Sequence, residues 1–169
     1  MARPVVKYGA AVLRTPARPV EAVTPEIQAL VDEMIATMYA ERGIGLAAPQ
    51  IGVDLRIFVI DISGGRDRGA LHVCINPEWV EREGMQLEEE GCLSVPGFSA
   101  TVARPARAVV QALDREGLPC RVEGTALLAR ALQHEMDHLD GRLYLDRLRG
   151  LNRTLIVNRI RKLERDGRW

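Results

Sequence analysis

The sequence has few cysteines, few aromatic residues and no long hydrophobic run. Its three cysteines are an odd number and widely spaced, which argues against a disulfide framework and leaves thiols free to bind metal in a reducing compartment. No stretch approaches the roughly 20 apolar residues that span a bilayer, and no apolar signal core follows the N-terminal residues. We therefore expect a cytoplasmic protein without a membrane partner.

The chain also lacks net charge. Lysine plus arginine and aspartate plus glutamate both number 23, so no overall field indicates DNA as a partner. Apolar residues make up 47% and charged residues 27%, which excludes disordered and collagen-like classes and predicts one domain over residues 1–169. The charge is uneven, however. Residues 147–169 carry seven arginines and one lysine against two acids, a net charge of +6, and are expected to form a basic helical tail.

The first predicted helix follows a clear start signal. Thr24 can cap a helix, Pro25 suits the first helical position, and apolar residues then recur with a helical period up to Gly43. Between Gly43 and Gly52, glycines and a proline break both helix and strand. This second segment is predicted to be a shaped loop.

Short strands are predicted in the middle of the chain. They are expected over residues 55–60, 71–75, 79–82, 85–89 and 101–113, with another ending near Val122. Pro105 predicts an edge or bulged start for the 101–113 strand. Because the strands are grouped between helices without strict alternation, the pattern indicates an α+β fold.

Two further helices are predicted after the strands. The first begins at Thr125 and ends at Gly141, where a glycine is well placed to stop a helix. The second is expected over residues 152–164. Its apolar face is expected to contain Leu155, Ile156, Ile160 and Leu163.

The helix expected after Thr125 contains the pattern His134-Glu135-Met136-Asp137-His138. Histidines at positions i and i+4 are separated by roughly 40° around a helix axis, so both rings can bind one metal ion. Glu135 can then reach a water at that ion. The alternative interpretation is a solvated polar face of the helix.

The third metal ligand decides the class of the site. An extended His-x-x-Gly-x-x-His motif needs a histidine at position 144, which is a tyrosine. Glu164 lies in the charged tail and is a poor candidate for a downstream glutamate ligand. Upstream, Cys92 lies in a segment bounded by glycine and proline, and its thiolate would complete a Cys-His-His site. Taken alone, a cysteine such as Cys92 is more often a small buried thiol, but its setting and the otherwise missing third ligand favour the metal site.

Three segments resemble the signature motifs of one family. They are Gly43-Ile44-Gly45-Leu46-Ala47-Ala48-Pro49-Gln50, Glu90-Gly91-Cys92-Leu93-Ser94 and Gln133-His134-Glu135-Met136-Asp137-His138-Leu139-Asp140-Gly141. Their sequences and their order are similar to those of peptide deformylases, and the resemblance extends over nearly the whole chain. It implies short antiparallel strands packed around a central helix that carries the HExxH motif, with a C-terminal helix.

The resemblance also implies the reaction and its cofactor. The expected reaction removes the formyl group from the N-terminal formylmethionine of newly made proteins, by a metal-activated water with Glu135 as general acid and base. One divalent ion is expected on Cys92, His134 and His138, with Fe2+ as the ion in the cell and Zn2+, Ni2+ or Co2+ as compatible alternatives. Gln50 and the backbone N–H of Leu93 are expected to bind the oxyanion.

The same resemblance implies where substrate binds. The residues expected along the substrate are Ile44, Gly45, Glu90, Gly91, Leu127, Arg130 and Ala131. Leu127, Ala131 and the aliphatic stem of Arg130 are expected around the methionine side chain, and the Arg130 charge is expected to pair with Glu90. Family members often carry a basic residue just after the cysteine motif, but this chain has Gly97-Phe98-Ser99 there.

The expected partners are nascent formyl-methionyl polypeptides and, through the basic tail, the ribosome. A tail helix docked on the domain with a solvated basic side is the simpler alternative. Two other functions also fit the motif. One is a metallopeptidase that cuts internal peptide bonds. The other is a structural zinc site, which needs a fourth protein ligand from His72, Cys74 or Cys120.

Overall fold

The computed structural model describes every residue from Met1 to Trp169. The helices are α1 (Pro25–Ala40), α2 (Ala126–Leu139) and α3 (Leu151–Arg165). The strands are β1 (Gly45–Ala47), β2 (Ile57–Asp61), β3 (Leu71–Glu83), β4 (Gln86–Gly91), β5 (Ser99–Arg104), β6 (Arg107–Leu113) and β7 (Pro119–Thr125). Short 3-10 helices are η1 (Ala11–Arg14), η2 (Ala48–Ile51), η3 (Arg68–Ala70) and η4 (Tyr144–Arg147).

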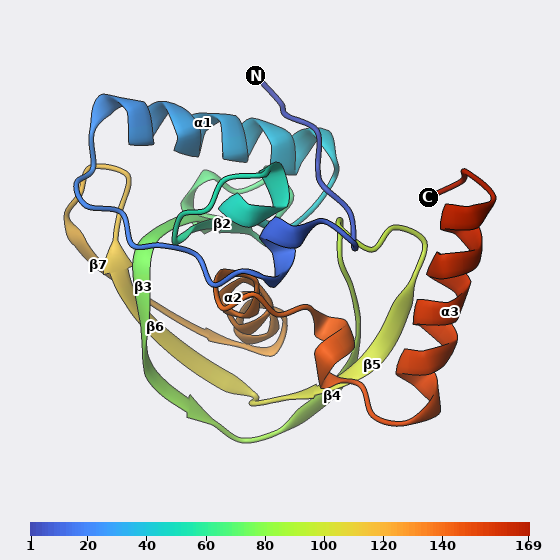
Figure 1. Cartoon of the computed structure of the whole chain (residues 1–169). Coiled ribbons are helices and arrows are strands. Elements are labelled where there is room, and N and C mark those ends of the chain that lie inside the picture. The colour runs from blue at the N-terminus through green and yellow to red at the C-terminus, as the bar shows by residue number, and fades with distance from the viewer.

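The strands form two antiparallel sheets around α2 (Figure 1). The larger sheet has the order β1-β2-β3-β6-β7, and β4 pairs with β5 in a separate two-stranded sheet. Helix α1 packs on β1 and β2, while α2 contacts β1, β2, β6 and β7. This is the α+β architecture that the sequence predicted, with the central helix inside the curved sheet. None of the helices is long and apolar enough to cross a membrane.

Strand β2 lies between the two main hydrophobic cores. Alternate side chains of a strand point to opposite faces, so Ile57 and Val59 join the cluster under α1, while Phe58 and Ile60 join the cluster over α2. All four side chains are fully buried, and each contributes roughly 1.5–3 kcal/mol of hydrophobic stabilisation. A strand buried on both faces explains why its sequence is a continuous apolar run.

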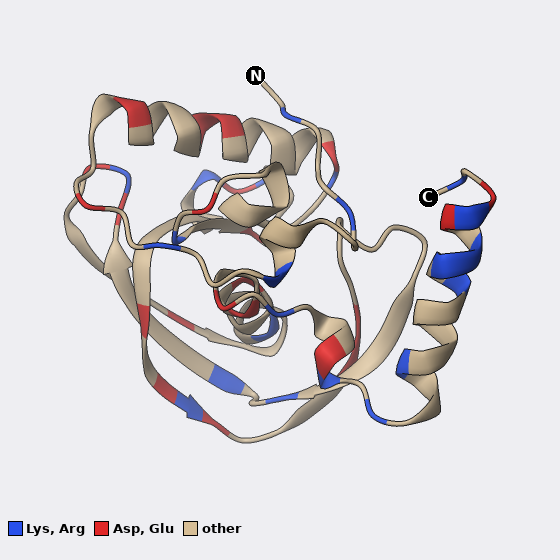
Figure 2. Ribbon diagram, in the orientation of Figure 1, with Lys and Arg blue, Asp and Glu red and all other residues tan.

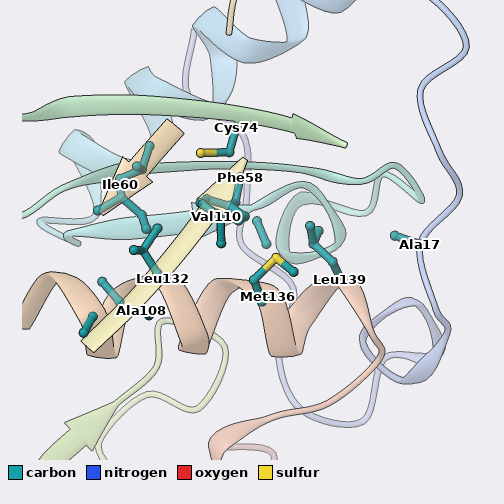
Figure 3. Packing of buried hydrophobic residues seen from close by; sticks show 13 residues of the cluster. Ala17, Phe58, Ile60, Cys74, Ala108, Val110, Leu132, Met136 and Leu139 are labelled. Carbon is teal, nitrogen blue, oxygen red and sulfur yellow. The ribbon is translucent and has the colours of Figure 1, made fainter. Parts of the chain in front are cut away.

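Helix α2 is buried at 11 of its 14 residues. Figure 3 shows Leu132, Met136 and Leu139 pointing from the helix toward Phe58 and Val110 of the sheet. The other face of α2 carries the two histidines of the HExxH motif and other polar residues, which are also buried. A buried polar face requires partners from other elements, and β4, β5 and the segment after β4 supply them.

The predicted start of α1 at Thr24-Pro25 is confirmed. Pro25 occupies the first turn, and the Thr24 hydroxyl accepts a hydrogen bond from the Ile27 N–H at 3.3 Å. This bond satisfies one of the N–H groups that have no partner inside the helix.

The prediction of a loop between Gly43 and Gly52 is wrong in part. Residues Gly45–Ala47 form β1, which pairs with Phe58–Ile60 of β2, and η2 follows directly. Tertiary pairing and burial override the weak strand preference of glycine here. The glycine has a packing role instead, described with the site below.

Two strand boundaries also differ from the prediction. The predicted strands 71–75 and 79–82 are one continuous strand, β3, with irregular register near Ile75 and near Trp79. The predicted strand 101–113 is two strands, because Pro105 separates β5 from β6 and these belong to different sheets. Pro105 has no N–H for a ladder bond, so the chain leaves one sheet at this residue and enters the other.

Helix α3 docks beside β5 through a narrower apolar face than predicted. Ile160 is fully buried in a cluster with Val95, Val102 and the η4 segment, and Ile156 is half-buried there. Leu155, which was expected on this face, is 58% exposed. Figure 2 shows basic residues along much of α3, concentrated toward its C-terminal end.

Helices α2 and α3 end in the same way, which allows a matched test of one contact. Gly141 and Gly167 both have positive φ, +75° and +66°, and the next residue donates its N–H back into the helix, Arg142 to Asp137 and Arg168 to Leu163. A Cβ on Gly141 would lie 2.8 Å from the carbonyl oxygen of Arg14, whereas a Cβ on Gly167 would meet nothing within 4 Å.

We predict that Gly141→Ala destabilises the protein more than Gly167→Ala. Both changes introduce left-handed strain of about 1–2 kcal/mol, and Gly141→Ala adds overpacking of about 1–3 kcal/mol against backbone that cannot move aside. Urea unfolding of the two variants and the wild type measures the difference in the free energy of unfolding. Equal losses of unfolding free energy in the two variants would show that the backbone at Arg14 moves aside for the added methyl group without destabilising the protein.

Candidate active site

Three donor atoms converge where α2 faces the segment after β4. The Cys92 thiol sulfur lies 3.4 Å from His138 Nε2, which lies 3.2 Å from His134 Nε2. All three atoms lie within 4.8 Å of one another. The two histidines are one turn apart on α2, as the helical spacing predicted, while Cys92 comes from a segment 42 residues before His134 in the sequence.

The carboxylate of Glu90 orients His134. Its Oε2 lies 2.6 Å from His134 Nδ1, so the Nδ1 proton is donated to the carboxylate and Nε2 faces Cys92 and His138. A carboxylate behind a ligating histidine fixes the tautomer and makes the ring a better metal ligand. Glu90 is 7% exposed and lies at the end of β4, so the strand holds this orientation rigidly.

A buried ion-pair network surrounds Glu90. Arg104 of β5 donates to both carboxylate oxygens at 2.8 and 2.6 Å, and Arg130 donates to Oε1 at 2.8 Å. Burial opposes ionisation of Glu90, but the hydrogen bonds from Arg104 and His134 hold its pKa well below the usual range. Arg104 also donates to Asp137 at 2.9 Å, and Arg147 pairs with Asp137 from the other side. The network joins β4, β5, α2 and η4.

The three donors suit a divalent metal ion. Ligand atoms about 2.0–2.3 Å from one tetrahedral ion lie roughly 3.3–3.6 Å apart, close to the distances between His138 and its two neighbours here. Burial, together with the nearby charge of His134, lowers the pKa of His138 well below its usual value, which favours the neutral imidazole that binds metal. His72, Cys74 and Cys120 are absent from the cluster, so no fourth protein ligand closes the site. A closed structural zinc site does not fit this arrangement.

Glu135 lies beside the donors with one carboxylate oxygen free. The residue is 3% exposed, and its Oε2 has no hydrogen-bond partner in the protein. Burial raises the pKa of Glu135 to about 7, with His134 lowering it and Glu90 raising it further. A carboxyl group with a pKa near neutrality can both accept and donate a proton.

Gly45 of β1 provides the space that Glu135 occupies. A Cβ built on Gly45 would lie 2.5 Å from Glu135 Oε1, closer than real Cβ atoms approach other atoms. This glycine was expected along the substrate backbone. The structure adds a steric reason for it, since any side chain at position 45 collides with the carboxylate.

Gln50 and Leu93 place hydrogen-bond donors at the same point. Gln50 Oε1 accepts the Ala47 N–H at 3.0 Å, so the amide nitrogen is directed toward Cys92 Sγ at 3.6 Å and Ser94 Oγ at 3.2 Å. The backbone N–H of Leu93 donates to no group of the chain. The Leu93 N–H is therefore available to an oxygen of a bound molecule, and the Gln50 amide nitrogen lies next to the same metal ligand, Cys92.

A cavity of about 510 Å³ opens onto this cluster. It is lined by Glu41, Arg42, Gly43, Ile44, Gly45, Gln50, Glu89, Glu90, Gly91, Cys92, Leu93, Pro96, Gly97, Leu127, Arg130, Ala131, His134 and Glu135. Every site residue expected from the sequence lines it except His138, which lies behind the other two ligands and is 1% exposed. The ion pair expected between Arg130 and Glu90 is present.

Two kinds of site residue were not predicted from the sequence. The first kind forms the rim of the cavity and comprises Glu41, Arg42, Glu89 and the Pro96-Gly97 turn. These residues lie next to the motifs in the sequence, and this nearness could have predicted them. Other missed residues stabilise the site from behind, namely Ser94, Arg104, Asp137, Tyr144 and Arg147. The Tyr144 ring stacks near His134 with 6.3 Å between ring centroids. No sequence spacing connects β5 or η4 to the ligands.

Comparisons with known proteins show which family this chain resembles over its whole length. The sequence model of the family described as polypeptide deformylase matches residues 2–154. A peptide deformylase of Acidobacterium capsulatum is 48% identical over 169 residues, covering 100% of this chain and 99% of the relative. The crystal structure of a peptide deformylase from Legionella pneumophila superposes with a TM-score of 0.92 at 44% identity, covering 99% of this chain and 98% of the other.

A second solved structure adds a bound ligand. The peptide deformylase from Synechococcus elongatus, in complex with actinonin, has a TM-score of 0.87 at 38% identity and covers 99% of this chain and 90% of its own. The full-length match, the fold and the family model point to the same enzyme class, and the rival metallopeptidase has no support among these matches. This chain belongs to the polypeptide deformylase family, whose members are metal-dependent enzymes.

Proposed function

We propose that the cavity binds the formyl-methionyl end of a newly made protein and that Cys92, His134 and His138 hold the ion that assists removal of the formyl group. The observation that carries this assignment is the open Cys-His-His cluster with the unpaired Glu135 carboxylate beside it. A divalent ion held there would polarise the formyl carbonyl and make the attacking water more acidic. The rest of the mechanism follows from the residues of the chain.

Glu135 moves the protons. Its free carboxylate oxygen accepts a proton from the water that attacks the formyl carbon. When the bond between the formyl carbon and the methionine nitrogen breaks, Glu135 donates that proton to the departing amine, and formate is the second product. The pKa of Glu135, which burial raises to about 7, suits both directions of transfer.

Gln50 and Leu93 stabilise the charge that develops on the formyl oxygen. The Leu93 N–H can donate to this oxygen without moving. The Gln50 amide can donate in place of its contact with Cys92 Sγ or Ser94 Oγ, while the Ala47 N–H holds the Gln50 side chain in position. Donors already in place for a developing oxyanion lower the barrier more than donors that must move.

The proposed substrate contacts follow the cavity walls. Ile44, Gly45 and Gly91 line the cavity and are proposed to bond to the substrate backbone. A Cβ on Gly91 would lie 3.3 Å from the Phe98 carbonyl oxygen, which is a tight contact. Leu127, Ala131 and the stem of Arg130 form the proposed methionine pocket. We assign Glu90 a positioning role on this wall, since both of its oxygens are bonded to Arg104, Arg130 and His134.

We propose Fe2+ as the ion in the cell. A thiolate with two imidazoles also binds Zn2+, Ni2+ and Co2+, and supply rather than affinity alone decides among them. The test is anaerobic loading with each ion, followed by assay of deformylation on formyl-Met-Ala-Ser and metal analysis of protein purified from cells.

We predict that Glu135→Ala and Cys92→Ser fail in different ways in this assay. Glu135→Ala should retain the metal and lose about 10²–10⁴-fold in kcat, because only proton transfer is removed. Cys92→Ser should lose or weaken metal binding, because a neutral hydroxyl replaces an anionic thiolate. Metal analysis and steady-state kinetics on the same samples separate the two outcomes.

A Cys92→Ser variant with full metal content and activity would contradict the ligand assignment. Wild-type turnover in Glu135→Ala would remove Glu135 from the mechanism. Wild-type protein that cleaves unformylated peptides internally, and leaves formyl-Met-Ala-Ser intact, would overturn the proposed function itself.

We predict that Gly45→Ala inactivates the enzyme by displacing the Glu135 carboxylate. The added methyl would meet the carboxylate at 2.5 Å and push it away from the reacting water, so we expect a loss of about 10²-fold or more in kcat with the metal retained. Gly69→Ala is the control, because Gly69 does not line the cavity, has no positive φ, and a Cβ there would meet only the Asp67 carboxylate, at 3.3 Å. Normal kcat in Gly45→Ala would show that the carboxylate can work from another position.

We also propose that the basic side of α3 contacts ribosomal RNA. Arg159, Arg161, Lys162 and Arg165 are exposed and form no ion pair with an acidic side chain. All four lie in the C-terminal half of α3, where Figure 2 shows basic residues concentrated. An unpaired basic surface can neutralise phosphates, and such binding weakens steeply with salt because counterions are released.

The expected result is that changing these four residues to glutamate abolishes cosedimentation with ribosomes at low salt and leaves turnover of formyl-Met-Ala-Ser unchanged. The control changes Arg66, Arg68, Arg82 and Arg121, which are exposed on other surfaces, to glutamate and so alters total charge equally. If both variants sediment like the wild type across a salt series, α3 is only a docked helix.

A further inference from the structure

The N-terminal strap, which we define as Val6–Tyr8, connects the two segments that hold the proposed oxyanion donors. The Val6 N–H donates to the Gln50 carbonyl at 2.8 Å, and the Tyr8 N–H donates to the Ser94 carbonyl at 2.8 Å. N–H groups on alternate residues of an extended chain point the same way. The strap therefore bonds to η2 and to the cysteine loop (Cys92–Phe98) at once.

The same two segments are also joined on the side of the cavity. The Gln50 amide donates to Ser94 Oγ at 3.2 Å, and the Ser94 N–H lies 3.4 Å from the Cys92 sulfur. Gln50 and the cysteine loop are thus held together by a side chain on one side and by the strap on the other. The position of the Leu93 N–H relative to the Gln50 amide depends on both.

The C-terminal residue fixes the strap. The indole N–H of Trp169 donates to the Tyr8 carbonyl at 3.0 Å, across 161 positions of sequence. The Lys7 ammonium lies 5.9 Å from the centre of the indole. Trp169 thus contacts two consecutive residues of the strap, through a hydrogen bond and a cation–π interaction.

Trp169 also contacts the cysteine loop directly. Its ring lies 6.1 Å from the ring of Phe98, centroid to centroid, with the planes tilted by 56°. Such tilted aromatic pairs are attractive beyond their area burial. Phe98 follows Pro96 and Gly97, which line the cavity. One side chain therefore packs between the strap and the loop that carries a metal ligand.

The turn that ends α3 brings Trp169 to the strap and the cysteine loop. Gly167 adopts a φ of +66° and reverses the chain, and the Arg168 N–H closes the turn on the Leu163 carbonyl at 2.8 Å. Figure 1 shows the last residues turning back from the top of α3 toward the N-terminal segment. Helix α3 docks through the fully buried Ile160 and the half-buried Ile156, and Trp169 packs against the same hydrophobic cluster.

We propose that Trp169 is a positioning residue for deformylation: it holds the N-terminal strap against the cysteine loop and so fixes the spacing between the Gln50 amide and the Leu93 N–H. This inference rests on the proposed function of those two donors. Its physical basis is that donors act on the oxyanion only when they are already aligned. A loosened strap lets η2 and the cysteine loop move apart, while His134, His138 and Glu135 remain in place on α2.

Three variants test the proposal on the metal-loaded, full-length enzyme. Trp169→Ala removes the ring and the donor, and Trp169→Phe retains a ring beside Phe98 but loses the donor to Tyr8. Leu155→Ala is the control, because it truncates an exposed apolar side chain of the same helix. The measurements are metal content, kcat and KM on formyl-Met-Ala-Ser, and amide hydrogen exchange over residues 6–8 and 92–98.

For Trp169→Ala we expect kcat to fall about tenfold, less than the 10²–10³ lost when an oxyanion donor is removed outright. KM should stay within about twofold, because the interaction weakened is one made in the transition state. Exchange should accelerate in the strap and the cysteine loop but not in α2. Trp169→Phe should fall between Trp169→Ala and the wild type, and Leu155→Ala should match the wild type.

The proposal is overturned if exchange over residues 92–98 is the same in Trp169→Ala and the wild type. It is also overturned if kcat is unchanged, or if Leu155→Ala shows the same loss, which would reduce Trp169 to a stabiliser of α3. Failure of the proposed function has a different signature, since the wild type itself would then leave formyl-Met-Ala-Ser unchanged.

Discussion

The buried carboxylate of Glu90 is the interaction on which most of the site depends. It stays ionised because Arg104 and His134 bond to it, and it joins β4 and β5 to α2. Removing one partner from such a pair leaves an uncompensated buried charge, which costs roughly 3–5 kcal/mol. The second sheet, β4 with β5, therefore cannot move relative to α2 without breaking charge pairs inside the protein. This constraint holds Cys92, two residues after Glu90, against the histidines.

Helix α2 combines two kinds of burial. Its apolar face fills the concave side of the sheet. Its polar face is also buried, and most of the polar side chains on it form hydrogen bonds or ion pairs with residues of other elements. One exception is informative, because Glu135 Oε2 is buried beside the metal ligands without a hydrogen-bond partner. An unsatisfied buried polar atom is costly, and this one lies where a water or a substrate group would bind.

Secondary structure was predictable where the pattern is local. The cap at Thr24 and the period of α1 and α2 are properties of a few neighbouring residues, and the structure has these helices at the expected places. The strand boundaries were less predictable. Pro105 was visible in the sequence, but whether it bulges one strand or separates two depends on which strand pairs with which, and pairing partners lie far away along the chain. The exposure of Leu155 had the same cause, since docking angle rather than period decides which part of α3 is covered.

The sequence by itself determined the chemistry of the site: two histidines one helical turn apart with a glutamate between them, and motifs that resemble one family. Helix geometry alone brings His134 and His138 together, because i and i+4 share a face in any α-helix. The motifs already indicated Cys92 as the third ligand, but only the tertiary structure brings it to the histidines. Only the tertiary structure decided that Gly45 clears the space for Glu135 and that a buried arginine network lies behind Glu90. These relations join β1, the cysteine loop and β5 to α2, and contacts between distant segments depend on the packing of the whole chain, which no local spacing records.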